Sequence, residues 1–339
     1  MDRGVLNVKA MVIEEFGGPD VFVERDVDTP EPGPNQVRIR VVASSLNPIE
    51  TKIRSGFVKS GPAMPAILNG DVAGVVDKVG AGVTRFAVGD EVFGCAGGVK
   101  GWQGALADYM IADERVLAKR TSDMALPLEE CAALPLVFLT AWSALSDRSG
   151  LQSGEHVLIH AGTGGVGHVA IQIAKYLGAR VATTVSTQEK ADLARKLGAD
   201  DIIFYRDEPV ADYVQRLTGG KGFDLVFDTV GGENLDRSIE ATGIARRLTS
   251  INTRSTHDLS QLHAKSLSLH VVFRSIPLLH GIGMDDQPRM AAAMSDLIRK
   301  NAVRPLLDPQ RFTFSEVGEA HRKLEAGEAT GKILLLRTA

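Results

Sequence analysis

Regular alternation of short apolar strands with helices begins near residue 157 and constrains the fold more than any other feature of this sequence. Val157–His160 predicts a strand, a glycine cluster follows it, and Val166–Leu177 has helical spacing. The alternation continues with strands expected at Val181–Val185, Ile202–Phe204, Phe223–Phe227, Ile244–Ile251 and Leu267–Phe273, and with a helix at Glu189–Leu197. Strands that alternate with helices form βαβ units, so we expect an α/β fold with a doubly wound parallel sheet.

The segments on either side of this region have a different character. Runs such as Val37–Val42 and Ala73–Val79 are separated by turn sequences, which predicts a β-rich domain. The last segment contains an expected helix at Arg289–Asn301 and an expected strand at Lys332–Leu336 that is able to rejoin the first domain. The predicted organisation is a first domain over residues 1–130, a second over 131–273, and a return to the first over 274–339.

Composition and charge exclude several classes of protein. A length of 339 residues favours two domains, and a formal net charge of −4 with no basic run argues against a nucleic-acid partner. No apolar stretch is long enough to span a bilayer, and the amino terminus, MDRGVLNVK, lacks the apolar segment of a signal peptide. The two cysteines, Cys95 and Cys131, form no CxxC pair and favour a reducing, cytoplasmic setting.

The glycine cluster after the strand at Val157–His160 reads Gly162-Thr163-Gly164-Gly165-Val166-Gly167, a G-x-G-x-x-G pattern. Between a strand and a helix, this pattern is typical of a Rossmann dinucleotide site. Gly162 permits the tight turn, Gly164 lets the backbone approach a pyrophosphate, and Gly167 lets the helix lie close to the sheet. The helix amino terminus then offers N–H groups to the phosphates. The alternative is a glycine-rich turn with no ligand, but the strand–turn–helix context favours dinucleotide binding.

The tip of the next strand indicates which dinucleotide binds. NAD sites place a carboxylate there to bind the ribose, whereas here the strand is followed by Ser186. Ser186 is able to donate a hydrogen bond to a 2′-phosphate, and Lys190 lies one helical turn further on with a charge that suits it. Tyr205 and Arg206, after the following strand, are expected at the same corner. We therefore predict NADPH; the alternative for Lys190 is a solvated helix lysine.

The sequence offers poor ligands for a zinc ion. A zinc-dependent dehydrogenase needs Cys, His and acidic ligands near the cofactor. Neither cysteine has a His partner at ligand spacing, the eight histidines are scattered, and two cysteines are too few for a structural four-cysteine site. His160, beside the glycine cluster, is expected to be a structural hydrogen-bonding group. We predict that no metal takes part in the reaction.

Short motifs in a fixed order run along nearly the whole chain. They are Phe16-Gly17-Gly18-Pro19, Asn47-Pro48-Ile49-Glu50-Thr51, Asp71-Val72-Ala73-Gly74-Val75-Val76, Val88-Gly89-Asp90-Glu91-Val92, Leu139-Thr140-Ala141-Trp142, His160 with the glycine cluster, and Thr330-Gly331-Lys332-Ile333. Each motif is short, but the ordered set is specific. By these motifs the chain resembles the medium-chain dehydrogenase/reductase superfamily, in particular its zinc-free quinone oxidoreductase (zeta-crystallin-like) branch.

The resemblance implies a GroES-like β-rich catalytic domain built from both chain ends, a central Rossmann domain, and a cleft between them. It also implies a homodimer or a homotetramer. The zinc ligands of related enzymes fall beside Asn47 and on Gly70 and Leu136, which cannot bind zinc. The family's cofactor contacts fall on Thr140, Thr163, Gly164, Gly165, Val166, Ser186, Lys190, Tyr205, Asn252, Thr253, Arg254, Val271, Val272, Phe273 and Lys332.

Three residues are expected to act at the substrate. Asn47 matches a polar residue that faces the substrate beside the nicotinamide, and its amide is the first candidate to stabilise the oxyanion formed on reduction. Thr140 is expected to hold the nicotinamide end or to donate to the carbonyl, the alternative being a core-facing threonine. Lys52 stands where many relatives have an aromatic residue that shields the nicotinamide, a departure that favours a more polar substrate.

The predicted chemistry follows from these donors. One good hydrogen-bond donor supplies about 3–4 kcal/mol, less than a Lewis-acid metal offers, so an intrinsically easy acceptor is expected. The predicted function is NADPH-dependent reduction of a quinone or an α,β-unsaturated carbonyl compound without zinc. One alternative is an enoyl-thioester reductase. Another is a dinucleotide-binding structural or RNA-binding protein with little turnover.

Overall fold

The protein, seen in a computed structural model that describes residues 7–338, divides into two compact units. Unit 1 runs up to Leu136 and resumes at Ser275, and unit 2 is Val137–Arg274. Residues 1–6 and 339, with most of the amino-terminal tail considered above, lie outside the described part of the chain. The expected α/β class is confirmed, since one unit is rich in antiparallel strands and the other contains a parallel sheet.

The sheet of unit 2 has the strand order of a dinucleotide-binding domain. Its strands are β9 (His156–Ile159), β10 (Arg180–Val185), β11 (Asp201–Phe204), β12 (Phe223–Asp228), β13 (Thr242–Ser250) and β14 (Ser268–Val271). Over the described residues they pair in parallel in the order β11-β10-β9-β12-β13-β14. This is the 3-2-1-4-5-6 order of the Rossmann fold, with its switch point between β9 and β12. The expected doubly wound sheet is therefore confirmed.

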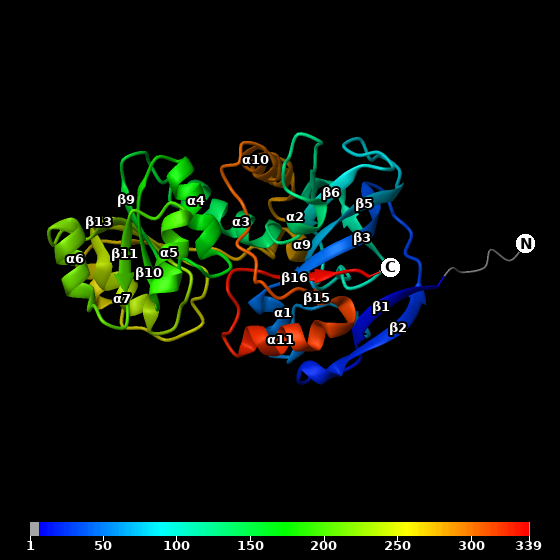
Figure 1. The fold of residues 1–339 in the computed structure, drawn as a ribbon, viewed down its shortest axis with the longest axis horizontal. Coiled ribbons are helices and arrows are strands. Elements are labelled where there is room, and N and C mark those ends of the chain that lie inside the picture. Colours follow the sequence, from blue (N-terminus) through cyan, green and yellow to red (C-terminus); the bar gives the residue numbers. More distant parts are fainter. Residues whose placement is uncertain (1–6, 339) are drawn as a thin grey trace, which may run out of the picture. The chain divides into compact units, whose positions relative to one another are not determined.

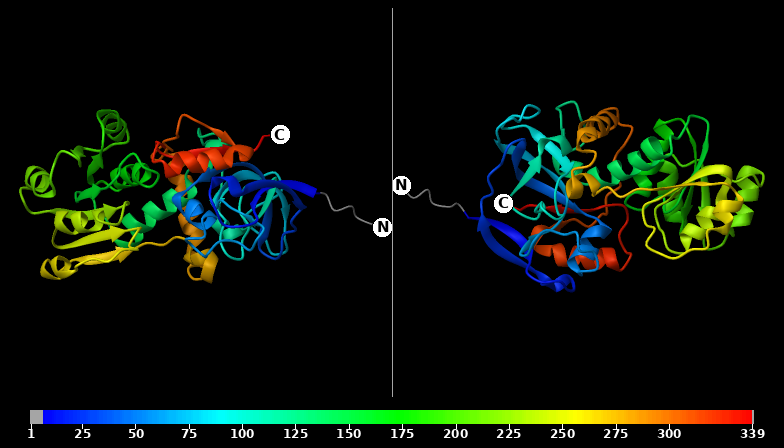
Figure 2. Two further views of the ribbon diagram at one scale, coloured as in Figure 1. Left: turned by 90° about the horizontal axis from the view of Figure 1, so that it is seen from below. Right: turned by 180° about the vertical axis from the view of Figure 1, so that it is seen from behind.

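Helices cover both faces of this sheet (Figures 1 and 2). They are α4 (Gly167–Tyr176), α5 (Gln188–Lys196), α6 (Val210–Thr218), α7 (Asn234–Ala241) and α8 (Ser260–Ala264). The chain moves from β9 towards one edge through α4 and α5, and then towards the other edge through α6, α7 and α8. Because crossovers are right-handed, the two groups of helices lie on opposite faces. Leu158, Val226 and Leu248 are fully buried in the core beneath them, as apolar strands covered on both faces require.

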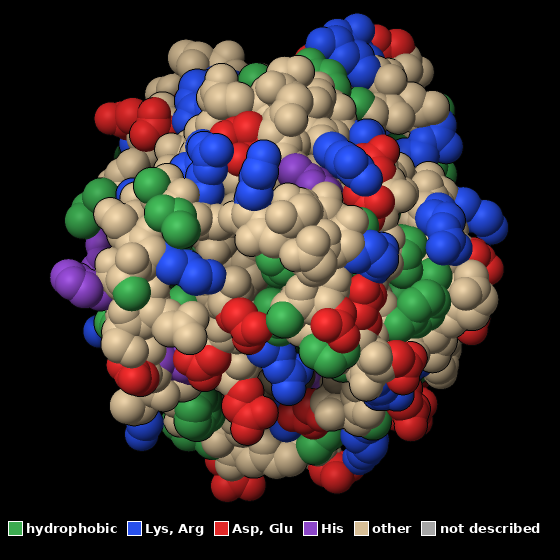
Figure 3. All heavy atoms as spheres, turned by 90° about the vertical axis from the view of Figure 1, so that its left-hand side faces the viewer, with side chains coloured by type: hydrophobic (Ala, Val, Ile, Leu, Met, Phe, Trp, Pro, Cys, Tyr) green, Lys and Arg blue, Asp and Glu red, His purple; other side chains and the backbone are tan. Residues whose placement is uncertain are grey.

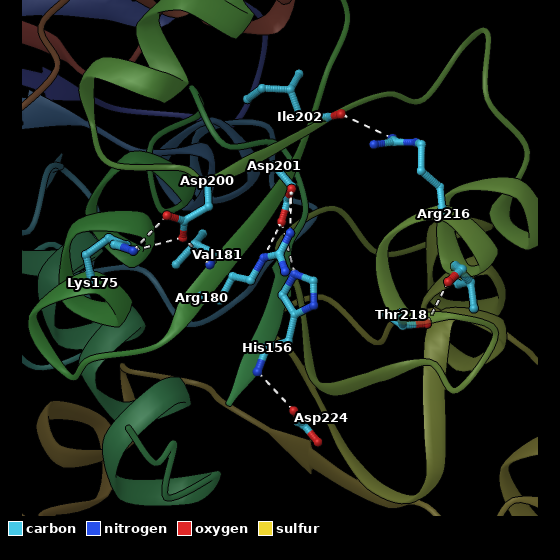
Figure 4. A network of polar contacts seen from close by, with 11 residues as sticks. His156, Lys175, Arg180, Val181, Asp200, Asp201, Ile202, Arg216, Thr218 and Asp224 are labelled. Carbon is cyan, nitrogen blue, oxygen red and sulfur yellow. Dashed lines mark hydrogen bonds and ion pairs between the residues drawn. The ribbon is translucent and has the colours of Figure 1, made fainter. Parts of the chain in front are cut away.

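Polar contacts at the amino ends of the strands hold neighbouring strands together (Figure 4). Asp201 accepts a hydrogen bond from Arg180 Nε at 2.8 Å and lies 3.3 Å from His156 Nε2, while Asp224 accepts one from the His156 backbone N–H at 2.9 Å. A hollow of about 600 Å³ opens at the same ends and has Arg246 on its wall. Because dinucleotides bind at the carboxyl ends of parallel strands, this hollow is not the cofactor site.

Unit 1 is the β-rich part of the chain. In the described residues its larger sheet contains β3 (Gln36–Leu46), β5 (Asp71–Val79), β6 (Glu91–Cys95), β7 (Tyr109–Asp113), β8 (Leu117–Lys119), β15 (Phe312–Thr313) and β16 (Ile333–Leu336). A smaller sheet contains β1 (Asn7–Ile13), β2 (Phe22–Asp28) and β4 (Ala66–Ile67). The strand expected near Lys332–Leu336 does rejoin the first part of the chain, because β16 pairs antiparallel with β3 and sets Leu334 opposite Ser45.

Helices complete unit 1. They are α1 (Pro48–Arg54), α2 (Leu128–Cys131), α9 (Ile276–His280), α10 (Gln287–Arg299) and α11 (Val317–Glu325), while α3 (Pro135–Trp142) crosses the boundary between the units. Residues from both chain ends share one apolar core, in which Ile39 and Leu335 are fully buried. No helix in residues 7–338 combines the length and the apolarity needed to cross a membrane.

Candidate dinucleotide and substrate site

The expected cofactor contacts of unit 2 lie mainly at one edge of its sheet. The glycine cluster follows β9, Ser186 follows β10, Tyr205 follows β11, Asn252 follows β13, and Val271 ends β14. Because the strands are all parallel, their carboxyl ends share one edge, and this is the edge at which Rossmann domains bind dinucleotides. The structure therefore brings residues that are far apart in sequence to the same edge of the sheet.

Close packing requires two of the glycines in the loop after β9. A β-carbon at Gly162 would lie 2.2 Å from Thr183 Oγ1, and one at Gly167 would lie 2.1 Å from the Ala161 carbonyl oxygen. A β-carbon at Gly164 would approach nothing closer than that same oxygen, at 3.2 Å. Gly162 and Gly167 thus fit the loop to the sheet and the helix, whereas Gly164 is partly exposed and is less closely packed.

The turn itself is braced by Thr184. Ala161 has a φ of +53°, a left-handed conformation that alanine rarely adopts. Its N–H donates to Thr184 Oγ1 at 2.9 Å, and His160 Nδ1 lies 3.3 Å from the same oxygen. Burial lowers the pKa of His160 to about 4, so its ring is neutral at neutral pH. His160 is a structural hydrogen-bonding group, as expected.

The corner beyond β10 and β11 carries two cationic side chains, Lys190 and Arg206. Thr187 caps α5 by accepting a hydrogen bond from the Lys190 N–H at 3.3 Å, which sets Lys190 in the first turn of the helix. Neither Ser186 nor the Lys190 ammonium forms a side-chain hydrogen bond or an ion pair with any residue that the structure describes. After β11, the guanidinium of Arg206 lies 5.7 Å from the centroid of the Tyr205 ring. This arrangement is suited to an anionic group.

Asp228, which sequence reasoning missed, organises the loop at the switch point. It ends β12 and is fully buried. Its carboxylate accepts hydrogen bonds from the Val230 and Gly231 N–H groups, both at 3.0 Å, from Asn234 Nδ2 at 2.8 Å, and from Ser250 Oγ at 2.9 Å. The sequence pattern that could have indicated Asp228 is an acidic residue at the end of an apolar strand, shortly before a Gly-Gly pair.

The remaining expected residues differ in their surroundings. The Asn252 amide donates to the backbone of the loop after β12 at 2.9 Å, whereas Arg254 is exposed. In Val271–Phe273 the central valine is buried and its two neighbours are about half exposed. Of the expected catalytic residues, Thr140 is buried in α3 and Lys52 is half-buried on α1.

Unit 1 joins Asn47 to two charged groups that are buried with it. Asn47 Nδ2 donates to Asp71 Oδ2 at 2.8 Å, and Asn47 Oδ1 accepts a hydrogen bond from Lys332 Nζ. Lys332 also donates to the Leu46 carbonyl at 2.9 Å and lies 3.6 Å from Asp71 Oδ2. Asn47, Asp71 and Lys332 are each at most 3% exposed. Lys332, expected among the cofactor contacts, therefore has its ammonium satisfied inside unit 1.

Two further contacts tie this cluster to its surroundings. Asp71 accepts hydrogen bonds from Ser45 Oγ at 2.9 Å and from the Leu136 N–H at 2.8 Å, which keeps the first turn of α3 in unit 1. Glu50 accepts one from the Asn47 N–H at 2.7 Å. Burial, reinforced by the Asp71 carboxylate, raises the pKa of Glu50 to about 7, against the opposing effect of Lys332. Burial also lowers the pKa of Lys332, although both carboxylates oppose this.

Two positions at which the resemblance places zinc ligands, Gly70 and Leu136, have side chains that do not suit a zinc ion. A β-carbon at Gly70 would lie 2.8 Å from the Gly97 carbonyl oxygen and 3.2 Å from Cys95 Sγ, so a ligand side chain has no room there. Leu136 has no donor atom in its side chain. Burial raises the pKa of Cys131 to about 12, which keeps its thiol protonated. No group of three or more His, Cys, Asp or Glu side chains in residues 7–338 is placed to hold a metal.

Comparison with known proteins identifies the family to which the chain belongs. Residues 33–122 match the alcohol dehydrogenase GroES-like domain family, and residues 165–298 match the family described as zinc-binding dehydrogenase. A quinone oxidoreductase of Pseudomonas aeruginosa is 36% identical over 337 residues, which cover 97% of this chain and 99% of that protein. The chain belongs to the quinone oxidoreductase branch of the medium-chain dehydrogenase/reductase superfamily. It is an oxidoreductase, and the resemblance inferred from the motifs is confirmed.

Two other similarities bear on the chemistry of this branch. A 2-haloacrylate reductase from a Burkholderia species is 39% identical over 69% of this chain and 69% of that protein. The crystal structure of an Escherichia coli quinone oxidoreductase complexed with NADPH has a TM-score of 0.84 and 28% identity, covering 97% of this chain and 99% of that one.

Proposed function

We propose that this oxidoreductase transfers a hydride from NADPH to a quinone or an α,β-unsaturated carbonyl compound without zinc. The observation that supports NADPH is the corner beyond β10 and β11, where Ser186, Lys190 and Arg206 follow the carboxyl ends of adjacent strands. A 2′-phosphate at this corner would meet a donor hydroxyl and two cations. The relatives agree, since one is a complex with NADPH and another is named for the reduction of 2-haloacrylate, an α,β-unsaturated acid.

Each group of residues has a part in the proposed reaction. Bound NADPH supplies the hydride, and the protein positions and polarises the reactants. The backbone of Thr163–Val166 binds the pyrophosphate, while Thr140 and Val271–Phe273 hold the nicotinamide end. The Asn47 amide donates to the substrate oxygen that gains negative charge, and Lys52 makes the substrate's surroundings more polar. Water supplies the final proton.

A turnover assay tests this function. The protein is mixed with NADPH and either 1,2-naphthoquinone or an alkenal, and the nicotinamide absorbance is followed in parallel with an NADH sample. We expect NADPH to be consumed faster than NADH, at a rate that prior dialysis against a zinc chelator leaves unchanged. Consumption with enoyl thioesters alone would favour the thioester reductase. A loss of turnover that added zinc restores would refute the metal-free mechanism.

The binding-protein alternative predicts a different outcome, which is high dinucleotide affinity with no consumption for any acceptor. On the face drawn in Figure 3, acidic and basic side chains are interspersed and no continuous basic surface appears. This face therefore gives no support to the alternative of an RNA-binding protein. We also propose that the chain forms a homodimer or a homotetramer in a cytoplasmic setting; light scattering of the purified protein measures the oligomeric state.

A further inference from the structure

The side chain of Asn47 lies between a group that only donates hydrogen bonds and a group that only accepts them. The Lys332 ammonium faces Oδ1, and the Asp71 carboxylate faces Nδ2. A flipped amide would set its NH₂ group against the ammonium and its carbonyl against the carboxylate. Both contacts would be repulsive, and with all three side chains at most 3% exposed, water would screen them only weakly. The amide therefore has a single orientation, enforced by charge.

This orientation leaves one hydrogen of Asn47 Nδ2 for another acceptor. The first is used by Asp71 Oδ2 at 2.8 Å. Within residues 7–338 the other acceptor near Nδ2 is Glu50 Oε1, at 3.5 Å, which is too long for a good hydrogen bond. The Lys332 ammonium, by donating to Oδ1, withdraws electron density from the amide and strengthens the remaining N–H as a donor.

We propose that Lys332 and Asp71 are positioning residues that hold and polarise the Asn47 amide, so that its second N–H is presented to the substrate oxygen that gains negative charge. This inference rests on the reductase function proposed above. Neither residue touches substrate or cofactor in this role. The competing explanation is purely structural, because Asp71 starts β5, Asn47 follows β3 and Lys332 precedes β16, so the cluster also clamps three strands together.

A matched pair of lysine variants separates the two explanations. K332M removes the donor to Asn47 Oδ1, and K332R keeps a cation there. K323M is the control, because Lys323 pairs at 2.6 Å with the buried Asp308 in the same unit, and its hydrogen-bond partners in the described residues are Asp308 and Gln310, not Asn47. For each variant the thermal midpoint, the NADPH affinity and the single-turnover rate of hydride transfer to 1,2-naphthoquinone are measured.

We expect K332M to lower the hydride-transfer rate about 10- to 100-fold, less than the roughly 10²- to 10³-fold cost of removing an oxyanion donor, because the Asn47 amide itself is kept. NADPH affinity should change less than about 3-fold. K332R should recover part of the rate. K323M should lower the thermal midpoint and leave the rate near that of the wild type. Equal rate losses in K332M and K323M would overturn the inference, since they would show that stability alone is affected.

A double-mutant cycle with N47A tests whether Lys332 acts through Asn47. If it does, K332M adds little to the loss already caused by N47A, whereas fully additive losses would contradict the proposal. An independent readout uses ¹H–¹⁵N spectra of the full chain labelled at asparagine, with the Asn47 side-chain signals identified by their absence in N47A. K332M and D71N should shift these signals and K323M should not; unchanged signals would overturn the positioning role. Because this readout needs no turnover, a wild-type protein that fails to consume NADPH would remove only the proposed function.

Discussion

Gly162 packs so closely against Thr183 that a β-carbon at this glycine would lie 2.2 Å from the threonine hydroxyl oxygen. That hydroxyl is already engaged, because it donates to the Ile159 carbonyl at 2.6 Å. The first glycine of the loop is thus fitted to β10 by steric contact, and β10 is tied to β9 by the same side chain. The shape of the dinucleotide loop is therefore set by the sheet before any ligand binds.

Alanine substitutions in this loop should have separable effects. G162A forces Thr183 or the loop to move, so we expect a loss of about 1–3 kcal/mol in the free energy of unfolding, as for other overpacked sites, and weaker NADPH binding. G164A has more room, and its effect should fall mainly on NADPH affinity. Urea unfolding and calorimetry measure the two quantities. A G162A protein as stable as G164A would contradict the steric argument.

Removing the Asp228 carboxylate should destabilise unit 2 strongly. D228A leaves the N–H groups of Val230 and Gly231 without their acceptor, so we expect a loss of about 3 kcal/mol or more in the free energy of unfolding. D228N keeps one acceptor oxygen and should lose less. D192N, which alters an exposed ion pair with Arg195, serves as the control and should cost less than about 1 kcal/mol. Similar losses for D228A and D192N in urea unfolding would show that Asp228 does not organise the loop.

A carboxylate paired with a cation usually stabilises a folded protein as pH rises. Glu50 should have the opposite effect on the free energy of unfolding. Its pKa is raised from 4.5 to about 7 in the folded protein, so between these values the folded state holds a proton that the unfolded state has released. Stability therefore falls as pH rises through this window. The E50Q variant cannot ionise and should lose this part of the dependence, while E319Q, at an exposed position, should retain it.

The comparison requires unfolding free energies of the three proteins at about pH 5 and about pH 8. Between these values the wild type and E319Q should lose on the order of 1–3 kcal/mol more than E50Q does. A wild-type profile that coincides with that of E50Q would mean that Glu50 is ionised throughout the range.

Local sequence pattern predicted most of the fold. The expected strand Val181–Val185 corresponds to β10, since an apolar and β-branched run covered on both faces is distinctive. Strand ends were less accessible to prediction. The expected Leu267–Phe273 is longer than β14, because pairing with β13 is limited to Ser268–Val271. Side-chain hydrophobicity alone does not reveal where a partner strand ends.

Some features of the candidate site could also be predicted from the sequence, and others could not. The glycine cluster and Ser186 could be predicted, because parallel strands bring their carboxyl ends to one edge whatever else the chain does. The contact between Lys332 and Asn47 could not, since the two residues are 285 positions apart and nothing in their spacing links them. The role of Asp228 could not be predicted for a different reason, because its carboxylate accepts hydrogen bonds from backbone N–H groups, which have no sequence signature.

The most direct test of the account is a calorimetric titration of the wild type, K190E and K196E with NADPH and with NADH. Lys196 is an exposed residue on the same helix as Lys190, so K196E makes the same change of charge away from the first turn. We predict that the wild type binds NADPH more tightly than NADH. K190E should weaken NADPH binding about 10- to 100-fold while NADH binding changes little, as the loss of one charge-assisted hydrogen bond implies, and K196E should resemble the wild type. If the wild type has no affinity for NADPH, or if K190E weakens NADPH and NADH binding equally, the proposal that Lys190 binds the 2′-phosphate of NADPH is wrong.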